Sequence, residues 1–258
     1  PHNDAARRVA QYRLSLDEHF CLRFARAIVE AKLRAHAGLL AERRDSEPQS
    51  RYLLTVCLRR LATSIAAVDE QASIASLRGL EGAGAAAYFE GFADLLPARL
   101  KFSGRNRRPP RDPVNALLSL GYTLLHAEAV LALYGAGLDP FIGFYHALDY
   151  GRESLACDLV EPLRVEVDRH ALMLFRSEKL RPEDFSTTES GCLLGKAGRA
   201  RFYGEWEQLA ARLRKLLAES VADVAGAIMQ AGGVAAPCSP ASDDAAAEEQ
   251  GTEADDGC

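Results

Sequence analysis

The 258-residue sequence lacks several features that would place it in a common protein class. No run approaches the ~20 apolar residues that span a bilayer, so we expect a cytoplasmic protein without membrane contact. The chain opens Pro1-His2-Asn3, with neither an initiator methionine nor a basic-then-apolar signal segment, and we expect a fragment or a processed chain. Its six cysteines show no C-x-x-C or zinc-like pairing, which favours free thiols in a reducing compartment.

The sequence also has no excess of basic residues, since the formal net charge is −5. The charge is uneven, however, because the segment from Val234 onward holds seven acids and no Lys or Arg. Removing those seven acids from the total leaves +2 for residues 1–233. A mildly basic body with an acidic tail does not exclude a nucleic-acid partner. The tail, 234–258, has no large apolar residues and is expected to be disordered.

Apolar residues recur at helical spacing through most of residues 1–233 and predict a single, mainly α domain. The first helix is expected over residues 4–44 with Leu16 facing inward, and the second follows with Tyr52 inward. Turn signals around short apolar pieces predict a small β-hairpin near 185–203. Further helices are expected over 73–96, 115–134, from the Glu161–Pro162 junction to 175, and 199–230.

One of these helices carries a carboxylate on its packing face. Glu81 falls on the apolar stripe that includes Leu77 and Tyr88. A carboxylate there must be ion-paired, protonated or bound to a metal, and a salt bridge to Arg105 or Arg108 is as good an explanation as a metal. The glycines and alanines around Glu81 indicate that another backbone or a ligand comes close.

The stretch 137–164 combines a histidine with two acids. His146 ends a short apolar run, and Asp158 and Glu161 stand i, i+3, so a helix would place them on one face. Two carboxylates among apolar neighbours repel each other unless a positive group lies between them, and a hard divalent cation would serve. The alternatives are a hydrogen-bonded core histidine and a solvated acid pair. His126 and Glu128 are lesser candidates.

Basic residues gather in the Pro/Gly-rich segment 101–113. This segment is either a phosphate-binding loop or a solubilising connector. An adjacent arginine pair on the second helix is likewise either a phosphate contact or a solvated face. The candidate phosphate contacts are Arg59, Arg60, Arg105, Arg107, Arg108 and Arg111, with Lys196, Arg199 and Arg201 as further candidates.

Four segments, taken in order, resemble the CRISPR-associated integrase and endonuclease family Cas1. They are LRGLEGAGAAAYF (77–89), FSGRNRRPPRDPVNALLSLGY (102–122), GLDPFIGFYH (137–146) and SLACDLVEPLRVEVD (154–168). The resemblance implies that Glu81, His146 and Glu161 bind Mg²⁺ or Mn²⁺ and that Asp158 is the adjacent catalytic acid. His126 stands where a number of relatives have tyrosine, so its role is open.

The resemblance also implies an activity and partners. The implied activity is insertion of spacer DNA by attack of a 3′-hydroxyl on phosphodiester bonds of the CRISPR repeat. The implied partners are double-stranded and branched DNA, the small adaptation protein Cas2, and a second copy of the intact protein. Family members dimerise through an N-terminal β domain, and nothing before residue 70 resembles strands. The alternative is therefore a catalytically incompetent DNA-binding scaffold from the same adaptation complex.

Overall fold

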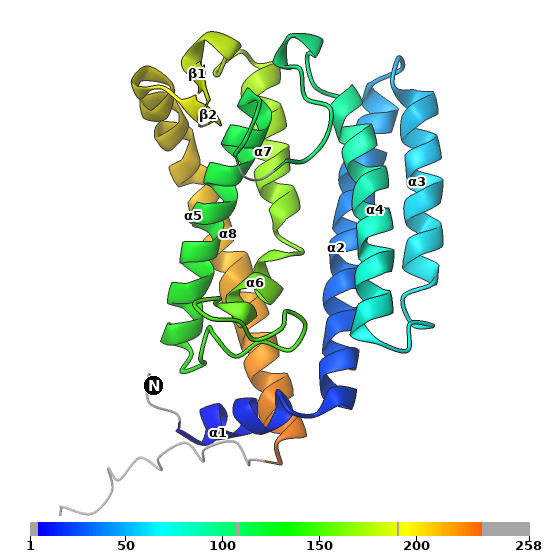
Figure 1. Cartoon of the computed structure of the whole chain (residues 1–258), viewed down its shortest axis with the longest axis vertical. Coiled ribbons are helices and arrows are strands. Elements are labelled where there is room, and N and C mark those ends of the chain that lie inside the picture. Colours follow the sequence, from blue (N-terminus) through cyan, green and yellow to red (C-terminus); the bar gives the residue numbers. More distant parts are fainter. Residues whose placement is uncertain (1–4, 107–108, 190, 234–258) are drawn as a thin grey trace, which may run out of the picture.

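A computed structural model describes residues 5–106, 109–189 and 191–233 (Figure 1). Within these ranges the backbone is mainly helical with one two-stranded hairpin, which confirms the predicted fold class. The helices are α1 (Ala5–Leu14), α2 (Glu18–Ser46), α3 (Arg51–Ala66), α4 (Ile74–Asp94), α5 (Pro113–Gly135), α6 (Ser154–Val160), α7 (Arg164–Arg176) and α8 (Lys196–Ala231), with 3₁₀ turns at Ala98–Leu100 and Pro182–Asp184.

The helices form two packed groups (Figure 1). On one side, α2, α3 and α4 pack against one another, and on the other α5 packs against α6, α7 and α8. Contacts between α2 and α7 join the groups, and α1 contacts α8 at one end of the molecule. The buried apolar side chains form one cluster that includes residues of both groups. Side chains of α2 and α4 can therefore meet those that precede α7.

The amino-terminal region contains two helices where the apolar pattern predicts one over residues 4–44. The Asp17 carboxylate accepts hydrogen bonds from the backbone amides of His19 and Phe20, and this cap starts α2 at Glu18. Leu16 lies in the break and is 82% exposed, so its predicted inward position is wrong. Tyr52 was also predicted inward, but it lies in the first turn of α3 and is exposed.

The small residues of α4 allow α2 to approach closely. A Cβ added at Gly84 would lie 2.3 Å from Leu33 Cδ2, and one at Gly91 would lie 3.0 Å from Leu40 Cδ1. The close approach expected from the glycines is thus made by another helix. It brings the inward face of α2 beside Glu81.

The helix α5 is long and apolar enough to cross a membrane, judged by length and composition alone. This corrects the expectation that no segment is sufficiently apolar. Only 33% of its most apolar window is buried inside the protein, but Leu117, Leu118 and Leu125 lie in the core, and α5 contacts α6, α7 and α8. These contacts are those of a core helix.

The predicted hairpin consists of β1 (Phe185–Thr188) and β2 (Gly191–Leu194), which pair antiparallel with Phe185 opposite Leu194. The last helix starts at Lys196, three residues before the predicted start. Cys21, Cys57, Cys157 and Cys192 are free thiols, as expected. Cys238, Cys258 and the predicted disordered tail, 234–258, lie outside the described residues.

Candidate metal centre

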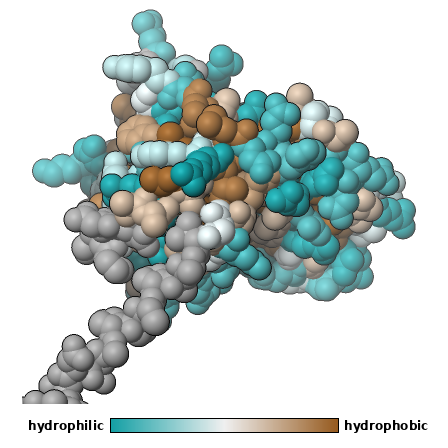
Figure 2. Space-filling view, turned by 90° about the horizontal axis from the view of Figure 1, so that it is seen from below, coloured by the Kyte–Doolittle hydropathy of each residue, from teal (hydrophilic) through white to brown (hydrophobic). Residues whose placement is uncertain are grey.

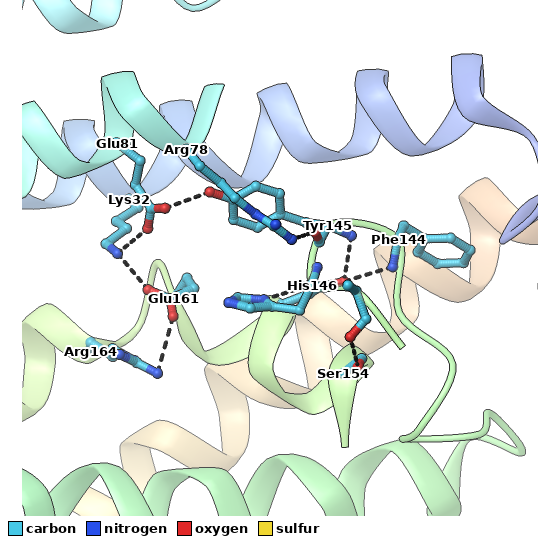
Figure 3. A network of polar contacts seen from close by, with 11 residues as sticks. Lys32, Arg78, Glu81, Phe144, Tyr145, His146, Ser154, Glu161 and Arg164 are labelled. Carbon is cyan, nitrogen blue, oxygen red and sulfur yellow. Dashed lines mark hydrogen bonds and ion pairs between the residues drawn. The ribbon is translucent and has the colours of Figure 1, made fainter. Parts of the chain in front are cut away.

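Three elements supply the predicted site residues (Figure 3). Glu81 comes from α4, His146 from the loop before α6, and Glu161 from the turn between α6 and α7. The predicted position of Glu161 at a helix junction is confirmed, because it follows the last residue of α6 and α7 begins at Arg164. Figure 3 shows Glu81 and Glu161 facing a common centre, with the imidazole ring of His146 directed toward Glu161.

The residue that joins the two glutamates is Lys32 of α2. Its Nζ donates a hydrogen bond to Glu161 Oε2 at 2.6 Å and another to Glu81 Oε1. The side chain is only 10% exposed. The two short ion pairs place one positive charge between two carboxylates. The sequence-based prediction assigns such a charge to a metal ion.

The pattern of α2 contains a signal for Lys32 that the predictions above do not use. Val29, Leu33 and His36 are buried on α2, and Lys32 stands three residues after the first and four before the last. It therefore lies on the inward face. Glu81 is a candidate because it is a charged residue on an apolar helix face, and Lys32 meets the same criterion.

Glu161 is buried and ionised. Arg164 Nη2 lies 3.0 Å from Glu161 Oε1, on the side away from Lys32. Burial alone would raise the pKa of this carboxyl group, but the charges of Lys32 and Arg164 outweigh burial and hold the pKa at about 2. The carboxylate is therefore present as an anion at neutral pH.

Asp158 does not share a cation with Glu161, and this part of the prediction is wrong. Its fully buried carboxylate accepts hydrogen bonds from the backbone amides of Phe144, Tyr145 and His146 at 2.8, 3.0 and 2.9 Å. The i, i+3 spacing places both acids on one side of the chain, but the loop 143–146 folds over Asp158 and satisfies it. Asp158 thus fixes the loop that carries His146.

The imidazole of His146 is oriented by the same carboxylate. His146 Nδ1 lies 2.7 Å from Asp158 Oδ1. When Nδ1–H donates to this oxygen, Nε2 keeps its lone pair. A carboxylate behind the far nitrogen of a histidine is the usual support for a metal-ligating imidazole. The geometry therefore gives Asp158 the role of orienting His146.

Glu81 has a second partner in Tyr145, whose hydroxyl donates to Glu81 Oε2 at 2.5 Å. Burial and this hydrogen bond raise the pKa of Tyr145, so the phenol stays protonated and acts as a donor. Arg78 Nη2 in turn donates to the Tyr145 carbonyl oxygen at 3.0 Å. The ion pair that the packing face of α4 predicts for Glu81 exists, with Lys32 in the place predicted for Arg105 or Arg108.

No three His, Cys, Asp or Glu side chains in the described part of the chain stand close enough to hold a metal ion. At this site the ammonium group of Lys32 lies between the two carboxylates. Binding of a metal by Glu81, His146 and Glu161 therefore stays a prediction.

A hollow of about 570 Å³ adjoins His146. Arg78, Tyr145 and His146 contribute to its wall, and the exposed side chains of Leu16 and Leu148 stand at the same hollow. Figure 2, which views the molecule from below relative to Figure 1, shows hydrophobic residues gathered among hydrophilic ones on that face. The site is thus reachable from solvent.

The candidate phosphate contacts differ in their surroundings. Arg59 and Arg60 are exposed on α3, and Arg60 pairs with Glu90. Arg111 is exposed in the loop before α5, whereas Arg107 and Arg108 lie outside the described residues.

Arg105 is directed inward. It donates to Asn115 Oδ1 at 2.7 Å and to Ser119 Oγ at 3.2 Å, and it lies 5.1 Å from the ring centre of Tyr122. These contacts hold the loop to α5, so a structural role explains this arginine.

The lesser candidates are paired elsewhere. His126 Nε2 lies 2.6 Å from Glu153 Oε2, and Glu128 forms an ion pair with Arg214 of α8 at 2.7 Å. Neither residue contributes to the contacts around Lys32.

A second buried acid, Asp168, contacts the site indirectly, through a tyrosine. Asp168 of α7 accepts hydrogen bonds from Tyr88 at 2.8 Å and from Tyr122. Complete burial raises its pKa to about 6 in spite of these bonds. Arg164 lies 5.0 Å from the ring centre of Tyr122, so the tyrosine links Asp168 to the arginine that holds Glu161.

Comparisons with known proteins find relatives of this chain. Residues 1–208 match the family model described as CRISPR associated protein Cas1. The chain is 42% identical over 232 residues to "CRISPR-associated endonuclease Cas1 1" of Thermodesulfovibrio yellowstonii, covering 89% of this chain and 73% of the relative. It is 41% identical over 208 residues to "CRISPR-associated endonuclease Cas1 3" of Thermus thermophilus, covering 80% of this chain and 60% of that relative.

A solved structure shows the same fold. The "Partial Cas6-RT-Cas1--Cas2 complex" superposes with a TM-score of 0.79 at 27% identity and covers 86% of this chain and 69% of that one. The chain spans 60–73% of the length of the two curated relatives described above.

Proposed function

Because the chain belongs to the Cas1 family of CRISPR-associated endonucleases, we propose that it is a divalent-metal-dependent DNA endonuclease and integrase of CRISPR adaptation. The observation that supports the metal dependence is that Glu81 and Glu161 share one cationic partner, Lys32, and that the His146 ring is directed toward Glu161, with its Nδ1 held by buried Asp158. Family membership alone does not identify the groups that do the chemistry, and this arrangement supports the choice of these residues.

The residues present fit a hard divalent cation. Two carboxylates and one imidazole form a mixed oxygen and nitrogen donor set of the kind that binds Mn²⁺, and Mg²⁺ is the commoner alternative in cells. The site already attracts a cation, because Lys32 lies between the two carboxylates. Glu161 is ionised at neutral pH, since its pKa is about 2, so no carboxyl proton has to leave Glu161 first.

The proposed reaction is a phosphoryl transfer on DNA. The 3′-hydroxyl gives up its proton to solvent as its oxygen bonds to phosphorus, the bond from phosphorus to the 3′-oxygen of the repeat strand breaks, and that leaving oxygen takes up a proton from solvent. A bound divalent ion supplies Lewis-acid stabilisation of the charge on the reacting oxygens. Glu81, Glu161 and His146 would hold that ion, while Asp158 orients His146 and Arg164 keeps Glu161 in place. We assign no side chain as the general base.

DNA contacts and partners complete the proposal. Arg59, Arg60 and Arg111 are exposed and basic, so we assign phosphate contacts to them first. Cas2 is proposed as a partner because a similar fold occurs in the Cas6-RT-Cas1–Cas2 complex. Double-stranded and branched DNA, a homodimer of the intact protein and a cytoplasmic location are proposed on family grounds.

The test is cleavage of branched DNA in the presence of Mn²⁺. Wild-type protein should cut, and Glu81→Ala and His146→Ala should each lose activity while keeping their fold by circular dichroism. Glu128→Ala is the matched control, because that acid pairs with Arg214 on the surface, and it should retain activity. DNA binding by the wild type without any Mn²⁺-dependent cleavage would instead support the catalytically incompetent scaffold.

A further inference from the structure

The position of Lys32 creates a conflict with any ion at the same site. Its ammonium group bonds one oxygen of Glu161 and one of Glu81. A divalent ion held by these carboxylates needs oxygen atoms from the same pair, in the same small space. Two positive groups a few ångströms apart in a partly buried site repel each other strongly. The ammonium and the ion therefore exclude each other.

The local charges show what the lysine does without an ion. Glu81 and Glu161 carry two negative charges, and Lys32 and Arg164 carry two positive ones. Arg164 contacts Glu161, whereas Lys32 contacts both acids. Without Lys32, Glu81 would keep only the Tyr145 hydroxyl as a hydrogen-bond partner within the described residues, and repulsion would separate the two acids.

We propose that Lys32 is an exchangeable internal cation, which holds Glu81 and Glu161 together in the metal-free protein and is displaced when the divalent ion binds. This inference rests on the proposed function, because the ion it competes with is the one proposed above. It assigns Lys32 a role as a positioning residue.

Two properties make lysine suited to this role. Its charge sits at the end of a flexible four-carbon stem, so the ammonium can leave without movement of α2. The stem comes from the helix that Gly84 brings against α4, so the lysine reaches Glu81 while remaining largely buried. The consequence is that metal affinity includes the work of displacing Lys32.

The test is titration of Mn²⁺ into the full chain without DNA, followed by calorimetry. Lys32→Met should bind Mn²⁺ at least about tenfold more tightly than wild type, a difference of about 1.4 kcal/mol. Lys32→Arg keeps the positive charge and should not show this gain. Lys179→Met is the matched control, because Lys179 forms its ion pair with Glu205 at 2.7 Å away from these acids, and it should bind Mn²⁺ as wild type does.

A second measurement does not depend on catalysis. Without metal, Lys32→Met should melt at a lower temperature than wild type, because the two acids lose their shared partner. Added Mn²⁺ should then raise its melting temperature by more than it raises that of wild type. If Lys32→Met does not fold, Lys32→Gln provides the same neutral comparison with hydrogen-bonding capacity kept.

The outcomes separate this inference from the proposed function. If Mn²⁺ binds wild type and is lost in Glu161→Gln, but the neutral Lys32 variants bind it no more tightly, the exchange is refuted and the metal site stands. If neither wild type nor any variant binds Mn²⁺, both proposals are refuted.

Discussion

Gly143 offers a test of how His146 is held in place. A Cβ at this position would lie 2.7 Å from the Ser154 backbone carbon, 2.8 Å from Asp158 Oδ2 and 2.9 Å from the Leu155 amide nitrogen. Two of these atoms are backbone at the start of α6, and the third belongs to a carboxylate with four partners. None can move aside as the end of a flexible side chain could. Gly143→Ala must therefore push the loop 143–146 away from Asp158.

The size of the effect follows from these contacts. Forcing a methyl group into a packed site costs about 1–3 kcal/mol. Each hydrogen bond to the Asp158 carboxylate that breaks fully costs about 1.5–3 kcal/mol more, and one that only lengthens costs less. With partial relaxation we expect Gly143→Ala to lose about 2–4 kcal/mol of unfolding free energy. Because His146 moves with the loop, Mn²⁺-dependent cleavage should fall by about a hundredfold.

The assay is urea unfolding followed by circular dichroism, with cleavage of branched DNA measured on the same preparations. Gly82→Ala is the control, since a Cβ at Gly82 meets no atom within 4 Å. Alanine is the better helix former, so this change should add up to about 1 kcal/mol. If Gly143→Ala unfolds within about 0.5 kcal/mol of wild type, a range typical of neutral surface changes, the account of Asp158 as the anchor of this loop is wrong.

Three further predictions concern the surroundings of the site. The pKa of Asp168 is raised from 3.8 to about 6 by burial, so its contribution to stability is full below about pH 4 and is lost as pH rises through 6. At 1.36 kcal/mol per pKa unit, the unfolding free energy of the wild type should fall by about 3 kcal/mol over this range relative to that of Asp168→Asn. Urea unfolding at each pH measures this, and parallel curves for the two proteins would contradict it. Tyr88→Phe removes one donor to Asp168 and should lower the unfolding free energy at pH 7 by about 1.5–3 kcal/mol, with an unchanged urea midpoint counting against it. Arg111→Ala should weaken DNA binding and lower the slope of log affinity against log salt by ~0.9, whereas Arg105→Ala should reduce stability and leave that slope unchanged; the opposite pattern would exchange the two roles.

Much of the site is readable from residue order because it depends on local pattern. An acid on an apolar helix face must be neutralised, and Glu81 is ion-paired as that rule requires. Pro162 places Glu161 at a helix junction, and the structure has α6 end just before it. Both conclusions need only the helical period and the backbone limits of proline.

The partners of these groups could not be read in the same way. Lys32 is 49 residues from Glu81 and 129 from Glu161, and helical periodicity does not say which helix faces which. The spacing of Asp158 and Glu161 likewise predicts one shared cation, but the loop 143–146 closes over Asp158 and supplies three amides. The path of this loop depends on the close approach of Gly143 to the start of α6, and residue spacing does not reveal that approach.

The sequence by itself determined the helical class, the hairpin and the position of Glu161 at a helix junction, because these follow from short-range periodicity, turn chemistry and the backbone limits of proline. Only the tertiary structure decided that Asp158 anchors the His146 loop, that Arg105 turns inward, and that a lysine from α2 lies between the two glutamates. Those outcomes depend on packing between segments far apart in the chain, where the approach of whole helices and loops decides which charges meet.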